Sequence, residues 1–120
     1  MIITLCGSAR FEPEFKAWNK RLTLAGHVVI SLAVYSSDEG GKEWYTPAQK
    51  ETLDLVYLQK IDAADAVLIL NVGGYVGAST RRELAWARLQ GNDVFWLEEP
   101  DEGVREDEHL VAALLEQGAP

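Results

Sequence analysis

One strand-to-helix junction constrains this chain more than any other stretch. Residues 66–70 form an uninterrupted apolar run, which is typical of a strand buried on both faces of a sheet. Residues 71–77 then contain three glycines, and residues 84–90 are good helix formers. We therefore expect a strand, a glycine turn, and a helix capped by Ser79 that carries an ionised Glu83 in its first turn. Such a junction either binds an anionic ligand or is only a tight turn.

The same alternation of strand and helix recurs along the chain. Apolar runs predict strands over 2–6, 27–32, 66–70 and 93–97, and helical patterns or starts follow at 11–25, 46–64, 84–90 and from Leu110 onward. This is the order of an open parallel α/β sheet. Right-handed crossovers favour the strand order 2-1-3-4 in a flavodoxin-like or Rossmann-like three-layer sandwich of four to five strands. Because no linker or repeat interrupts the pattern, residues 1–120 are predicted to form one domain.

The predicted topology brings two unusual loops together. In an open α/β sheet, ligands bind at the carboxyl ends of the strands where the strand order reverses, which here is between the first and third strands. The first strand ends in Gly7-Ser8-Ala9-Arg10, and the third ends in the glycine turn that leads to Glu83. We therefore expect one crevice to contain both loops.

Composition excludes several classes of protein. A net charge of −8 argues against a nucleic-acid polymer as partner. The single cysteine, Cys6, cannot form an internal disulfide, so we expect a reduced, cytoplasmic protein. No apolar stretch is long enough to predict a membrane span. His27 and His109 lack the spacing of metal ligands, so no metal site is predicted. The acidic residues of 98–108 are expected to form a solvated loop.

The two loops carry a resemblance to a known family. Residues 5–10 (Leu-Cys-Gly-Ser-Ala-Arg), the glycine turn, Glu83 and the Leu-Ala-Trp-Ala of residues 84–87 resemble the nucleoside 2-deoxyribosyltransferase superfamily. The nearest branch is the small 2′-deoxynucleoside 5′-monophosphate N-hydrolases, and the resemblance covers nearly the whole chain through short motifs. It implies that Glu83 is the nucleophile that attacks the anomeric carbon, where a carboxylate can stabilise or trap an oxocarbenium-like cation.

The resemblance also implies binding residues and partners. The residues implied to bind the 5′-phosphate are Gly7, Ser8, Ala9 and Arg10 of the first loop, with N–H donors near Gly77 and Ser79. The implied substrate is a small nucleoside or nucleotide, no cofactor is needed for this chemistry, and a homodimer is expected because related enzymes often complete the site with a neighbour's residues.

The chain departs from the family at three positions. The family commonly has an aspartate on the helix before the third strand, and Tyr57 occupies that position here. Asp54 lies one helical turn earlier and can approach the same space, so both residues are candidates for a catalytic role. Arg81 and Arg82 replace the small residue and tyrosine often found before the glutamate. They are candidates for contact with a phosphate or with a partner subunit.

These residues predict cleavage, by hydrolysis or transfer, of the N-glycosidic bond of a nucleoside or (deoxy)nucleoside 5′-monophosphate. Hydrolysis is preferred because the loop of Ser8 and Arg10 suggests a phosphorylated substrate. The alternative is a non-catalytic nucleotide-binding or sensing module, which Tyr57 favours. A third interpretation is an enzyme like the phosphoribohydrolases that cleave adenine-type nucleotides, although Glu83 follows the glycine pair later than in their motif. Residues 33–45 carry Tyr35, Trp44 and Tyr45, which either stack on a base or anchor the loop.

Overall fold

The computed structural model describes residues 1–38 and 44–116, and these form a five-stranded, wholly parallel sheet. The strands are β1 (Ile2–Cys6), β2 (Val28–Ile30), β3 (Ala66–Ile69), β4 (Asp93–Trp96) and β5 (His109–Leu110). Their spatial order is β2-β1-β3-β4-β5, which confirms the predicted order 2-1-3-4 and adds a fifth strand at one edge. Leu110 lies in this short strand, so the expectation that it belongs to the terminal helix was wrong.

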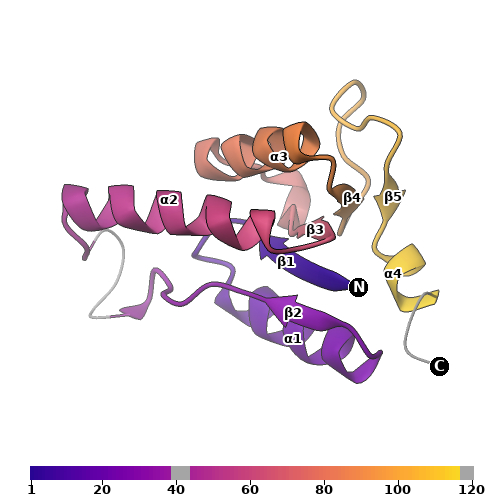
Figure 1. Cartoon of the computed structure of the whole chain (residues 1–120), viewed down its shortest axis with the longest axis horizontal. Helices are drawn as coiled ribbons and strands as arrows, with labels where there is room; N and C mark the ends of the chain where they lie inside the picture. The colour runs from indigo at the N-terminus through magenta and orange to yellow at the C-terminus, as the bar shows by residue number, and fades with distance from the viewer. Residues whose placement is uncertain (39–43, 117–120) are drawn as a thin grey trace.

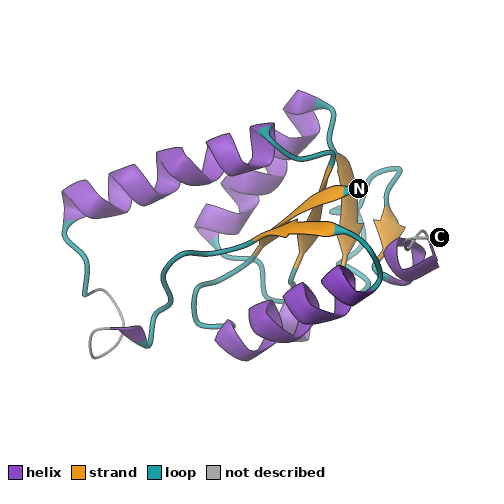
Figure 2. Cartoon of the chain, turned by 60° about the horizontal axis from the view of Figure 1, so that its bottom comes forward, coloured by secondary structure: helices purple, strands orange, loops and turns teal. Residues whose placement is uncertain are grey.

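Helices cover both faces of the sheet, as in a three-layer sandwich (Figures 1 and 2). They are α1 (Glu12–Leu24), α2 (Pro47–Asp62), α3 (Ala78–Gln90) and the short α4 (Ala112–Glu116), with a 3-10 turn η2 (Val72–Gly74) between β3 and α3. The paired helices α2 and α3 lie on one face, and α1 lies on the other. Within residues 1–38 and 44–116, no helix is both long and apolar enough to cross a bilayer.

Each face of the sheet has its own apolar cluster, because successive side chains of a strand point to opposite faces. The cluster beneath α1 and α4 includes Ile3, Leu5, Phe15, Leu22, Leu68, Phe95 and Leu114. The cluster beneath α2 and α3 includes Cys6, Tyr57, Ile61, Val67, Ile69, Leu84, Ala87 and Trp96. The functional loops therefore emerge from a sheet that is buried on both sides.

Local sequence signals place two of the helices where they were expected. Thr46 and Gln49 form a capping box at the start of α2: the Gln49 N–H donates to Thr46 Oγ1 at 3.1 Å, and the Thr46 N–H donates to Gln49 Oε1 at 2.8 Å. Gly26 follows α1 with a φ of 98°, a left-handed conformation that glycine adopts without strain.

The start of α3 differs from the prediction. The helix begins at Ala78, with an extended Gly77 as its N-cap and no side chain capping it. Ser79 lies inside the first turn, where its hydroxyl accepts from Lys50 and Arg82 instead of capping the helix. Glu83 lies in the second turn, so it is farther from the helix terminus than expected. The reason is that the glycine turn ends at Gly77, so the helix already begins at Ala78, five residues before Glu83.

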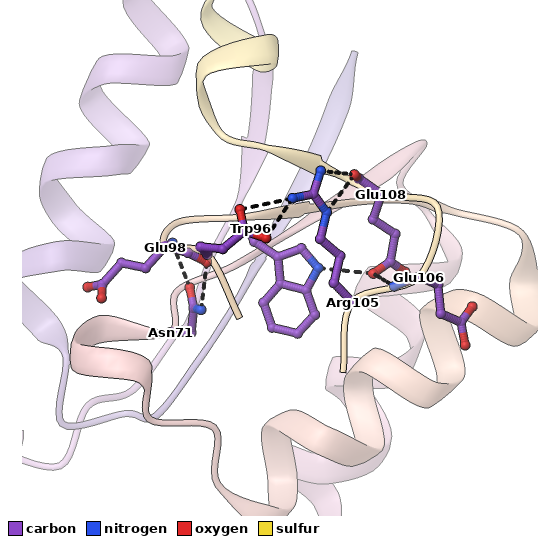
Figure 3. A network of polar contacts seen from close by, with 7 residues as sticks. Asn71, Trp96, Glu98, Arg105, Glu106 and Glu108 are labelled. Atoms are coloured by element: carbon purple, nitrogen blue, oxygen red, sulfur yellow. Dashed lines mark hydrogen bonds and ion pairs between the residues drawn. The ribbon is translucent and has the colours of Figure 1, made fainter. Parts of the chain in front are cut away.

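The acidic segment is only partly a solvated loop. Glu108 is buried, and its carboxylate accepts from the Arg88 guanidinium at 2.8 Å and from the Trp96 indole N–H at 3.0 Å. Arg105 Nε and Nη2 donate to the Glu108 carbonyl oxygen at 2.9 and 2.6 Å (Figure 3). The expectation failed for Glu108 because β5 joins the sheet edge and carries this residue over Trp96. Glu102 stays exposed, as expected.

Candidate active site

A cavity of about 340 Å³ lies at the carboxyl ends of β1 and β3, at the predicted reversal of strand order. Its walls come from the loop after β1, residues 32–36 after β2, the α2 helix and the start of α3. The sequence-predicted site residues that line it are Gly7, Ser8, Ala9, Asp54, Tyr57, Gly77, Ser79 and Glu83. Arg10 does not line it, and neither do the further candidates Arg81 and Arg82. The topology therefore brings together residues that are more than seventy positions apart in the chain.

Glu83 is a strongly perturbed carboxyl group of the cavity. Its Oε1 atom is buried and has no hydrogen-bond partner among the described residues. Burial raises the pKa of Glu83 to about 8, the nearby Asp54 carboxylate adds to this, and Arg82, Lys50 and the neighbouring Cys6 thiol oppose it. A pKa of about 8 favours the protonated carboxyl group at neutral pH, in contrast to the ionised Glu83 that was expected. The reason is that burial removes the side chain from water and no cation of the described residues pairs with it directly.

Cys6 lies beneath Glu83, at the last position of β1, and is fully buried. Burial raises the pKa of the Cys6 thiol well above its usual value, and the Glu83 charge raises it further. The thiol lies 4.0 Å from the Thr4 carbonyl oxygen, to which it donates a weak hydrogen bond. Cys6 therefore remains a neutral thiol and packs as a small buried hydrophobe.

Asp54 is held in a charged cluster beside Glu83. Lys50 Nζ lies 2.5 Å from Asp54 Oδ1, and Arg82 Nη2 lies 3.4 Å from Asp54 Oδ2. Both cations also lie 3.3 Å from Ser79 Oγ, which ties α2 to the first turn of α3. Asp54, Lys50 and Ser79 all line the cavity, so its polar wall carries both signs of charge.

Tyr57 occupies the position of the family's aspartate but is fixed to the sheet. Its hydroxyl donates to the Leu5 carbonyl oxygen of β1, and the side chain is buried. Burial raises the pKa of Tyr57 well above its usual value. The ring therefore forms a wall of the cavity, and its proton is committed to the backbone of β1.

Two glycines border the cavity, and the absence of a side chain has a different effect at each. A Cβ at Gly7 would lie 3.1 Å from Leu70 Cβ and 3.3 Å from the Leu70 carbonyl oxygen, so glycine lets the loop after β1 approach the end of β3. Gly77 leaves the first N–H groups of α3 without a side-chain cap. Because Gly77, Ala78, Ser79 and Thr80 all line the cavity, these N–H groups lie beside it, where a helix terminus favours anions.

The turn before α3 is held by hydrogen bonds to Glu98, which follows β4. The Asn71 side chain donates to the Glu98 carbonyl oxygen and accepts from the Glu98 N–H, both at 2.9 Å (Figure 3). The Gly73 N–H donates to Glu98 Oε2 at 2.9 Å. The buried Asn71 thus joins the ends of β3 and β4, and this sets the path of the chain into α3.

Polar or aromatic lining residues that sequence reasoning missed include Lys50, Lys60, Tyr75 and Thr80. Lys50 had one signal, its position four residues before Asp54 on the same helix. Tyr75 lies in the glycine turn, which was considered only for its backbone. Of the aromatic residues of 33–45, Tyr35 and Tyr45 line the cavity, whereas the Trp44 indole N–H donates to the Tyr35 carbonyl oxygen at 3.2 Å. Residues 39–43 lie outside the described residues.

The site and sheet define a parallel α/β domain with a cavity at the reversal of strand order, and solved structures share this fold. One is the CMP N-glycosidase BcmB of Clostridium botulinum, with a TM-score of 0.52 and 19% identity over 80% of this chain and 70% of that chain. Another is a 2-deoxyribosyltransferase of Bacillus psychrosaccharolyticus, with a TM-score of 0.61 and 18% identity over 88% of this chain and 77% of that chain. No protein-family model matches the chain, and no curated protein matches it in sequence. The fold expected from the family resemblance is thereby confirmed.

Proposed function

We propose that this chain hydrolyses the N-glycosidic bond of a nucleoside 5′-monophosphate, with Glu83 as the nucleophile. The observation that carries the proposal is the Glu83 carboxyl group: one oxygen is buried and unpaired among the described residues, and the side chain lines a cavity large enough for a small ligand. The two similar structures, a CMP N-glycosidase and a 2-deoxyribosyltransferase, support glycosidic-bond cleavage or transfer as the kind of reaction.

The proposed reaction has two steps. In the first, Glu83 loses its proton to solvent and a carboxylate oxygen bonds to the anomeric carbon as the carbon–nitrogen bond breaks; the base leaves with the electron pair and takes up a proton from solvent. In the second, water attacks the same carbon as the bond from that carbon to Glu83 breaks, and the proton that the water loses returns to Glu83, which yields the free sugar phosphate. A second base in place of water would give transfer instead of hydrolysis.

The electrostatics of the cavity suit this chemistry. A nucleophile must be ionised, and the raised pKa of Glu83 makes its anion costly in the empty cavity. The positive charge that develops on the sugar offsets that cost only as the bond breaks, so the interaction is strongest in the transition state. Asp54 adds negative charge beside the same point, and Lys50 and Arg82 keep it paired.

The part of the cavity at the start of α3 suits a phosphate group. The first N–H groups of α3 border it, Ser8 and Ser79 add hydroxyl donors, and Lys50 adds an ammonium group that also pairs with Asp54. An anion at this point would lie one helical turn from Glu83, along the α3 helix. A nucleotide bound here would therefore present its sugar near the carboxyl group and its phosphate at the helix start.

The test is chromatographic detection of free base from a panel of ribonucleoside and deoxyribonucleoside 5′-monophosphates, beside the unphosphorylated nucleosides. Wild type and Glu83→Gln are assayed together, with Glu51→Gln as the matched control because Glu51 is exposed on α2 and does not line the cavity. We expect release that requires the phosphate, that Glu83→Gln lowers by at least about a thousandfold, and that Glu51→Gln leaves unchanged. Full activity in Glu83→Gln would contradict the proposal.

A nucleotide sensor without catalysis is the second candidate, and Tyr57 favours it. The hydroxyl at the position of the family's aspartate is committed to the Leu5 carbonyl, so no carboxyl group stands there to assist the leaving base. Calorimetric binding of a monophosphate with no base released after long incubation would establish the sensor. The homodimer and the cytoplasmic location stay predictions, and sedimentation equilibrium tests the first.

A further inference from the structure

We propose that Tyr75 is a ligand-contacting residue of the phosphate end of the cavity, and that Arg10 is a positioning residue that acts through Tyr75. This rests on the proposed function for the phosphate, and it revises the role that the family resemblance implied for Arg10. The observations concern three side chains of two loops, those after β1 and β3.

Arg10 lies outside the cavity lining and stacks on two aromatic rings. Its guanidinium carbon lies 4.0 Å from the centroid of the Tyr75 ring and 5.1 Å from that of Phe11. The Phe11 and Tyr75 rings meet edge to face, with centroids 6.0 Å apart and an interplanar angle of 82°. Tyr75 lines the cavity and Arg10 does not. Arg10 and Phe11 together therefore hold the Tyr75 ring from the side away from the ligand.

The Tyr75 hydroxyl reaches the start of α3 because Gly77 has no side chain. A Cβ at Gly77 would lie 2.9 Å from the Tyr75 hydroxyl oxygen and 3.3 Å from the adjoining ring carbons. The hydroxyl therefore lies over Gly77, the N-cap of the helix whose first residues line the cavity. A phenolic O–H at this point can donate to an oxygen of an anion bound beside those N–H groups.

Without its contacts Tyr75 would be free to turn into solvent. The side chain is 44% exposed and comes from a turn that contains two glycines of positive φ, Gly73 and Gly74. A ring with that much exposure is ordered mainly by what it stacks on. Arg10 thus lowers the conformational entropy that is lost when the Tyr75 hydroxyl is ordered at the cavity. The Arg10 charge itself stays on the side of the ring away from the cavity.

Inorganic phosphate is the probe, because its binding depends on neither base nor sugar. Titration calorimetry compares wild type with Tyr75→Phe, Tyr75→Ala, Arg10→Ala and the double variant Arg10→Ala/Tyr75→Ala. We expect Tyr75→Phe and Tyr75→Ala each to weaken phosphate binding about tenfold, because both remove the O–H donor. Arg10→Ala alone should weaken it about threefold, since the ring is retained but less ordered.

The double variant decides the route by which Arg10 acts. If Arg10 works through Tyr75, the Arg10→Ala change has no further effect once Tyr75→Ala has been made. An undiminished effect in that background would show direct contact between Arg10 and the anion, and would overturn the proposal. Arg21→Ala is the control for charge and stacking, because Arg21 lies 4.6 Å over the Trp18 ring and its side chain is not part of the cavity lining.

Two further outcomes would also overturn the inference: no phosphate binding by wild type, or wild-type affinity in Tyr75→Phe. Tyr75→Phe keeps the aromatic ring and removes only the hydroxyl group. Weaker phosphate binding by this variant is therefore due to the lost hydroxyl and not to a loss of folding. With a cleaved 5′-monophosphate, Tyr75→Phe should raise KM about tenfold with kcat unchanged. If no nucleotide is cleaved, the proposed function fails while the phosphate titration still decides this inference.

Discussion

The raised pKa of Glu83 makes a measurable prediction about stability. The folded-state pKa of about 8 lies above the ordinary value of 4.5, so the unfolded chain loses this proton at lower pH than the folded chain does. Stability contributed by this group is therefore full below pH 4.5 and is lost as the pH rises toward 8. A difference of this size corresponds to about 5 kcal/mol at pH values above both, of which about 4 kcal/mol falls between about pH 5 and about pH 9.5.

Glu83→Gln removes the titration and keeps the shape. Urea denaturation followed by circular dichroism, at intervals from pH 5 to pH 9.5, gives the free energy of unfolding of wild type and variant. We expect near-equal stability at the acid end and a variant more stable by about 4 kcal/mol at the alkaline end. Glu51→Gln, an exposed carboxyl on α2, should show no such trend. A Glu83→Gln difference that is constant with pH would refute the reasoning, because it would mean that Glu83 titrates normally in the folded chain.

Three smaller predictions concern stability, each measured by urea denaturation at neutral pH. Thr46→Ala should cost about 1 kcal/mol through the lost capping box, whereas Thr52→Ala on the exposed face of the same helix should cost less than about 0.5 kcal/mol. Glu108→Ala should cost about 3 kcal/mol because it leaves the Arg88 guanidinium and the Trp96 N–H without their acceptor, while exposed Glu102→Ala should be near neutral; equal effects would contradict the burial of Glu108. Gly73→Ala should cost about 1 kcal/mol because φ is 63° there, although a Cβ would meet no atom within 4 Å; a neutral result would mean that the turn relaxes.

Much of the fold could be predicted because it depends on local patterns. The apolar runs indicated four strands, and Thr46-Pro47 indicated the start of α2. The right-handedness of crossovers between parallel strands then allowed few strand orders. β5 could not be found this way, because His109–Leu110 is two residues long and is stabilised by pairing with β4 and by the Glu108 ion pair. No periodicity accompanies so short a strand.

The candidate site was predictable where the backbone defines it and not where side chains meet. The topology alone placed Ser8 and Glu83 in one crevice. The Lys50–Ser79 contact joins residues 29 positions apart, and it depends on the packing of α2 on α3, which sequence spacing does not specify. The direction of Arg10 likewise depends on a ring in another loop. The pKa of Glu83 depends on how deeply the helix buries it, which a position in the sequence does not reveal.

The position of Cys6 gives the chain a built-in probe of its own opening. It is the only cysteine in the sequence, it is fully buried at the end of β1, and its thiol faces the Glu83 carboxyl group. A thiol reagent can modify it only when β1 or the helix above it separates from the rest of the fold, so the labelling rate reports the free energy of that separation. A bound ligand that bridges the loop after β1 and the start of α3 would slow labelling in proportion to its occupancy. Because the chain has a single cysteine, the labelling rate ranks candidate ligands by affinity without knowledge of the reaction.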